Sequence, residues 1–180
     1  MNLSNKLTVA RILAIPIIIV LYLAGKTYWA AAVFIAAAAT DILDGYIARK
    51  NGSVTAFGKF FDPIADKILM LTALALLLES GKISSIIVII ILSRDFLISG
   101  LRLVAIADGQ IIASSRLAKV KTVTQDIALS LLLLDNFPFR YINVPMDIIT
   151  LYISLVFTIW SGIDYMFKNI KTVKSLNKDH

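Results

Sequence analysis

The chain has 180 residues, of which 58% are hydrophobic and 17% are charged, and its formal net charge is +6. A water-soluble domain of this length has too little interior to bury so much apolar surface, which excludes an ordinary soluble globular protein. The positive charge could suggest nucleic acid, but basic loops on one membrane face explain it better, so no nucleic-acid partner is expected. The absence of cysteine excludes disulfides and thiolate metal sites.

Six apolar segments follow one another along the chain, each close to the roughly 20 residues needed to cross a bilayer. Turn-forming residues separate them, and they cover residues 7–24, 28–49, 58–80, 84–107, 117–134 and 145–167. We therefore predict an all-α polytopic membrane protein with six transmembrane helices in a single domain, residues 1–180. The first segment also resembles a secretory signal, but no A-x-A-like cleavage site follows it, and five further spans would retain the chain in the membrane.

The distribution of lysine and arginine predicts the orientation in the membrane. Twelve of these residues fall at the termini and at the second and fourth loop regions, which lie on one side: Lys6, Arg11, Arg49, Lys50, Lys59, Arg116, Lys119, Lys121, Lys168, Lys171, Lys174 and Lys178. The other side has three, Lys26, Lys82 and Arg140. Because basic loops stay in the cytoplasm, we expect both termini to be cytoplasmic and the protein to lie in the plasma membrane.

Four aspartates stand where the second and third segments meet this cytoplasmic side. Asp41 and Asp44 are three residues apart near the end of the second segment, and Asp62 and Asp66 are four apart near the start of the third. On helices, each pair lies on one face. Because a short loop joins the two segments, the sequence predicts that the four carboxylates meet near the cytoplasmic edge of the bilayer.

A single aspartate near a helix end is more often an interfacial residue than a ligand, but four inside spans need another explanation. Ionised side chains in a membrane segment cost several kcal/mol and normally mark function. Four carboxylates repel one another unless cations neutralise them, and oxygen-only ligands suit Mg²⁺ or Mn²⁺. Two such ions would form a clamp for phosphoryl transfer. The alternative from another class is a cation transporter, which predicts carboxylates spread along a pore instead of gathered at one edge.

Small residues share the faces that carry these carboxylates. Gly45, Ala48 and Gly58 leave room for a ligand against the helices, although close helix packing explains them equally. Arg49 follows Ala48 and suits a phosphate, or serves as an interfacial anchor.

These residues resemble the signature of the CDP-alcohol phosphotransferase family: D-x-x-D-G-x-x-A-R, eight residues, then G-x-x-x-D-x-x-x-D, with every defined position filled. The opening from Asn5 to Arg11 is similar to the family's N-P-N-x-L-T-x-x-R, without the proline. Residues 93–95, 100–102 and 119–122 resemble elements of the family branch whose acceptor is glycerol 3-phosphate. Mild departures from that branch stand at Ser93, Asp95, Gly100 and Ala118.

The resemblance implies a homodimer of six-helix subunits, each with a polar cavity open to the cytoplasm. It implies that Asp41, Asp44, Asp62 and Asp66 bind two Mg²⁺ or Mn²⁺ ions, and that Asp66 is also the general base. It further implies that the cytidine diphosphate part of a CDP-diacylglycerol donor lies against these residues: Gly45, Ala48, Arg49, Thr55, Gly58, Asn5 and Thr8.

An acceptor that carries a phosphate needs a basic pocket. Arg94 and Arg102 are eight residues apart on one face of the fourth segment, and Lys119 and Lys121 begin the fifth, so these four are expected to bind the phosphate of sn-glycerol 3-phosphate. The alternatives are an ion pair between Arg94 and Asp95, and simple interfacial anchoring of the two lysines. Other acceptors within the family stay open: phosphatidylglycerol (making cardiolipin), inositol phosphate or serine.

Overall fold

The structure is a computed structural model that describes residues 3–51, 56–107 and 116–168, with side chains described for residues 7–40, 61–105 and 117–168. These ranges form helices and contain no strand: α1 (Leu3–Leu23), α2 (Thr27–Asn51), α3 (Ala56–Glu79), α4 (Ser85–Ala107), α5 (Arg116–Leu133), the short 3-10 helix η1 (Phe139–Ile142) and α6 (Met146–Lys168). The all-α prediction is confirmed. The six α-helices match the six apolar segments, and the largest difference is that α1 begins at Leu3 instead of Leu7.

Three of the helices, α1, α3 and α5, end in the same backbone cap. Each is followed by a residue with positive φ: Gly25 (74°), Gly81 (73°) and Asp135 (52°). The N–H of the next residue bonds to the carbonyl five residues back, at 2.9 to 3.0 Å. This cap satisfies carbonyls that the helix end leaves open, and glycine reaches the left-handed conformation at the lowest cost. The Gly-Lys breaks in the sequence therefore end α1 and α3 for a local reason.

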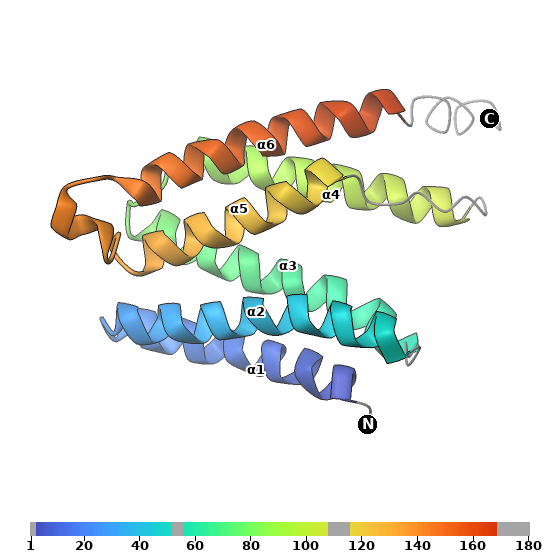
Figure 1. Ribbon diagram of the computed structural model, residues 1–180, viewed down its shortest axis with the longest axis horizontal. Coiled ribbons are helices and arrows are strands. Elements are labelled where there is room, and N and C mark those ends of the chain that lie inside the picture. The colour runs from blue at the N-terminus through green and yellow to red at the C-terminus, as the bar shows by residue number, and fades with distance from the viewer. Residues whose placement is uncertain (1–2, 52–55, 108–115, 169–180) are drawn as a thin grey trace. The chain divides into compact units, whose positions relative to one another are not determined.

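The chain divides into two compact units. The first comprises Met1–Ile83 and Leu129–Asp147, and the second comprises Ser84–Ala128 and Ile148–His180. In the first unit α1 packs against both α2 and α3. Figure 1 shows that the N-terminal end of α1, the C-terminal end of α2 and the N-terminal end of α3 lie at the same end of this unit. The helix segments that carry Asp41, Asp44, Asp62 and Asp66 therefore lie toward the same end of this unit, and the meeting of the four carboxylates stays a prediction.

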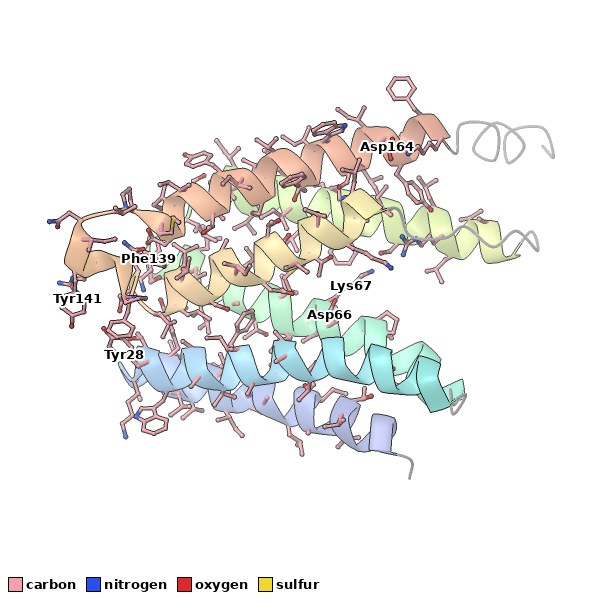
Figure 2. The ribbon with its side chains drawn as sticks, viewed as in Figure 1. Tyr28, Asp66, Lys67, Phe139, Tyr141 and Asp164 are labelled. Atoms are coloured by element: carbon pink, nitrogen blue, oxygen red, sulfur yellow. The ribbon has the colours of Figure 1, made fainter. Side chains whose placement is uncertain are left out.

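At the opposite end of the first unit, Asp135 makes hydrogen bonds to two other chain segments. Its carboxylate accepts hydrogen bonds from Lys82 Nζ at 2.5 Å and from Thr27 Oγ1 at 3.3 Å, and Lys82 also donates to the Leu132 carbonyl at 3.0 Å. Two other chain segments, the start of α2 and the turn after α3, thus contact the residue that caps α5. Tyr28 and Tyr141 lie at this end (Figure 2), and both pack edge-on against Phe137.

The pattern of exposure on α6 is the reverse of that on a helix in water. Its buried residues recur every three or four positions and are mostly polar: Leu151, Ser154, Thr158, Ser161 and Tyr165. Its exposed positions include Trp160, Ile163 and Phe167. A water-soluble helix buries its apolar stripe and exposes its polar one, so α6 is suited to an apolar solvent such as lipid.

By length and composition, α6 is the one helix within the described ranges that qualifies whole as a membrane span. Shorter apolar stretches occupy Leu7–Leu23 of α1 and Thr27–Thr40 of α2. Charged residues interrupt α3, α4 and α5, for example at Asp66, Arg94 and Lys121. Six membrane spans therefore stay a prediction, while the six helices are found.

Candidate active site

The structure places Asp62 in contact with α1. The hydroxyl of Thr8 donates a hydrogen bond to Asp62 Oδ1, which joins the first helix to the third across 54 residues of chain. Thr8 is fully buried, and Asp62 and Asp66 are partly exposed one helical turn apart on α3. A carboxylate that accepts a bond from a fixed hydroxyl is held in one orientation, as a ligand must be.

A buried arginine lies beside this contact on α1. Arg11 is three residues after Thr8 on the same helix face, and 1% of it is exposed. The sequence counts Arg11 among the basic residues of the cytoplasmic side, and the structure adds that its side chain is buried. The spacing in the sequence already indicates that positions 8 and 11 share a face of the first helix. A buried guanidinium is costly without anions nearby, so Arg11 differs from an exposed basic residue at the membrane surface.

The other predicted donor-site residues lie in a part of the chain whose side chains the structure does not describe. α2 runs helically through Asp41, Asp44 and Arg49 to Asn51, so these positions keep the helical spacing assumed from the sequence. The side chains of Asn5, Asp41, Asp44, Gly45, Ala48, Arg49 and Gly58 fall outside the description, as does Thr55 entirely. Among the described side chains, no three carboxylates or histidines gather as a metal site would. The complete ligand set is therefore still a prediction.

The second unit contains an ionic cluster built from three helices. Asp95 of α4 accepts from Arg94 Nη1 at 3.0 Å and from Lys121 Nζ of α5 at 2.7 Å to each of its oxygens. Arg94 Nη2 donates to Ser161 Oγ of α6 at 2.9 Å. The pair between Arg94 and Asp95, which the sequence left as an alternative, is present. Lys121 lies in the same cluster, and 3% of its side chain is exposed, so it is not an interfacial anchor.

The remaining two predicted acceptor residues differ from each other. Arg102 is partly buried on α4 and its guanidinium stands 5.7 Å from the centre of the Tyr165 ring, a cation–π contact with α6. Lys119 is exposed. Sequence reasoning missed Ser161 and Tyr165, because serine and tyrosine in an apolar segment carry no signal until the helix that they face is known.

The sequence model described as CDP-alcohol phosphatidyltransferase matches residues 1–160. Among curated relatives, CDP-diacylglycerol–glycerol-3-phosphate 3-phosphatidyltransferase of Bacillus subtilis is 41% identical over 98% of this chain and 99% of its own length. The protein of the same name from Rickettsia typhi is 43% identical over 95% and 98%.

A cardiolipin synthase (CMP-forming) of Oryza sativa is 36% identical over 93% of this chain but 57% of its own length. The family match covers most of the chain, including Thr8, the four aspartates and the ionic residues Arg94, Asp95 and Lys121. The chain therefore belongs to the CDP-alcohol phosphatidyltransferase family.

Proposed function

We propose that this chain transfers the phosphatidyl group of CDP-diacylglycerol to sn-glycerol 3-phosphate, giving phosphatidylglycerophosphate and CMP. The observation that carries the proposal is the match, over nearly the full length of both chains, to relatives that bear the name of this activity. The cardiolipin synthase relative is covered over little more than half of its length. Glycerol 3-phosphate is therefore favoured over phosphatidylglycerol as the acceptor.

The donor side of the site is proposed at the end of the first unit where α1, α2 and α3 meet. Asp41, Asp44, Asp62 and Asp66 would hold two divalent cations, Mg²⁺ or Mn²⁺. Their all-oxygen donor set suits these hard ions, and the Thr8 hydroxyl already orients Asp62. When bound, the cations neutralise the pyrophosphate and the charge that develops on the leaving CMP.

The residues from the sequence motif complete the donor site. We assign the cytidine diphosphate contacts to Gly45, Ala48, Arg49, Thr55 and Gly58, with Asn5 nearby. Thr8 reaches this site through Asp62, because its hydroxyl donates to that carboxylate. Arg11, buried on the same face as Thr8, adds positive charge where the donor's phosphates would lie.

The acceptor side is proposed at the basic cluster of the second unit. A phosphate monoester needs cationic donors, and Arg94, Arg102 and Lys121 supply them from helices of one compact unit. Lys119, which is exposed, would act at the entrance and not inside the pocket.

The proposed reaction is one in-line displacement. The 1-hydroxyl oxygen of glycerol 3-phosphate attacks the phosphorus that carries diacylglycerol, the bond from that phosphorus to the bridging oxygen breaks, and CMP leaves. Asp66 takes the proton of the attacking hydroxyl. Asp66 is partly exposed, so a substrate group can reach its carboxylate. We also propose that the protein is embedded in the membrane, which the exposed apolar side chains of α6 support, and that it forms the homodimer implied by the family resemblance.

A panel of acceptors tests the proposal. Purified protein receives CDP-diacylglycerol, Mg²⁺ and, in separate reactions, labelled glycerol 3-phosphate, phosphatidylglycerol, inositol phosphate or serine. We expect kcat/KM for glycerol 3-phosphate to exceed the values for phosphatidylglycerol and serine by at least about a hundredfold, because a site built for a phosphate monoester strongly rejects acceptors that lack one. Inositol phosphate carries such a group, so a lower kcat/KM for it would show that the site also selects the glycerol part. A higher kcat/KM for phosphatidylglycerol would make the chain a cardiolipin synthase instead.

A further inference from the structure

One carboxylate in the second unit holds two cations that come from different helices. Asp95 accepts from Arg94 on its own helix α4 and, through both oxygens, from Lys121 on α5. Neighbouring residues on a helix do not normally face each other, so the Arg94 side chain has to turn toward Asp95 to make this contact. The turn fixes the direction in which the guanidinium points.

Arg94 is held from the opposite side by α6. Ser161 Oγ accepts from Arg94 Nη2 at 2.9 Å. The next residue, Gly162, leaves space for the stem of the arginine, since a Cβ at that position would stand 3.2 Å from Arg94 Cγ. Asp95, Ser161 and Gly162 therefore confine Arg94 at three points along its side chain.

Arg94 has donor capacity that the cluster does not use. Lys121 pairs with Asp95 and also interacts electrostatically with Asp126 on its own helix. Arg94 Nε, although buried, has no hydrogen-bond partner among the described residues. A buried donor without a partner is costly, and a phosphate oxygen would satisfy it.

We propose that Asp95 is a positioning residue for the acceptor: it fixes Arg94 and Lys121 in the spacing that receives the phosphate of glycerol 3-phosphate. The proposal rests on the proposed function of this pocket. Asp95 does not contact the substrate in this account. It keeps the Arg94 and Lys121 side chains ordered in the free protein. Binding of the acceptor then costs less conformational entropy, because these two side chains are already fixed.

The experiment compares Asp95→Asn, which keeps the shape but removes the charge, with Asp95→Glu, which keeps the charge. The matched control is Asp135→Asn, because Asp135 makes a comparable ion pair with Lys82 in the other unit. For each variant, kcat and KM are measured for glycerol 3-phosphate and for CDP-diacylglycerol, beside the thermal midpoint in detergent. Arg94→Ala is measured in the same series.

We expect Asp95→Asn to raise KM for glycerol 3-phosphate about tenfold or more, since charge-assisted contacts are at stake. KM for CDP-diacylglycerol should change less than twofold, and Asp95→Glu should recover most of the loss. Asp135→Asn should lower the thermal midpoint and leave both KM values unchanged.

Three results would overturn the proposal, and they can be told apart. If Arg94→Ala raises KM for glycerol 3-phosphate but Asp95→Asn does not, the pocket stands and the positioning role of Asp95 is refuted. If the wild-type protein makes no phosphatidylglycerophosphate, the proposed function is wrong. The role of Asp95 is then refuted as well, because it rests on that function. A fall in thermal midpoint with unchanged KM for Asp95→Asn would show a structural ion pair only and would also overturn the proposal.

Discussion

At the scale of single residues, the bond from Thr8 to Asp62 connects the opening of the chain with its carboxylate motif. The two residues are 54 positions apart, so the sequence alone does not show that the Thr8 hydroxyl contacts this carboxylate. Its effect is to hold the carboxylate in one orientation before any ligand arrives. Partners of this kind commonly change metal affinity by about 10- to 100-fold when they are removed.

We therefore expect Thr8→Ala to raise the Mg²⁺ concentration for half-maximal activity about tenfold, because Asp62 loses its hydrogen-bond donor. Thr8→Ser keeps a hydroxyl at the same place and should stay within about twofold of the wild-type value. Metal titration of the initial rate measures both. Equal Mg²⁺ dependence in Thr8→Ala and wild type would show that the bond does not orient a metal ligand.

At the scale of elements, the helices could be predicted closely and the contacts between them could not. The Gly25 and Gly81 breaks indicated where α1 and α3 end, because their caps are local. The spacing of Arg94 and Arg102 correctly placed them on one helix. By contrast, the partners of Arg94 depend on which face of α6 meets α4, and Ser161 is one of several small polar residues along α6 that look alike in the sequence.

The contact between α4 and α6 can be tested with two glycines. A Cβ at Gly162 would stand 3.2 Å from Arg94 Cγ, whereas a Cβ at Gly100 would meet nothing within 4 Å. Both positions lie inside helices, where alanine is favoured over glycine by roughly 1 kcal/mol. We expect Gly162→Ala to raise KM for glycerol 3-phosphate about two- to fivefold by displacing Arg94, because such sites require close placement.

Gly100→Ala is the matched control for this prediction. It should leave KM for glycerol 3-phosphate unchanged and keep or raise the thermal midpoint. The prediction is wrong if both alanine variants show the same KM, since the packing of Gly162 against Arg94 would then have no bearing on the acceptor.

At the scale of the whole molecule, exposed apolar side chains occur on every α-helix, among them Leu13, Trp29, Ile68, Ile89, Val123 and Phe167. In water such a surface would aggregate, and in a bilayer it is the expected one. The chain could be assigned to the membrane from composition alone. Its span boundaries could not all be established, because the charged residues of the site interrupt α3, α4 and α5.

The orientation can be measured directly, because the sequence has no cysteine. Ser84 is exposed before α4, on the side that carries few basic residues, and Ser175 stands in the basic tail. We expect an impermeant maleimide to label Ser84→Cys in intact cells and Ser175→Cys only after the membrane is permeabilised. Labelling of Ser175→Cys in intact cells would reverse the topology.

The transfer itself tests the central claim most directly. Purified protein is incubated with CDP-diacylglycerol and labelled glycerol 3-phosphate, with Mg²⁺ or with chelator, and labelled lipid and CMP are counted together. We predict one CMP for each labelled phosphatidylglycerophosphate with Mg²⁺, neither product with chelator, and a loss of about a hundredfold or more for Asp66→Asn. Release of CMP with no labelled lipid, or undiminished transfer in the chelated reaction, would contradict the account.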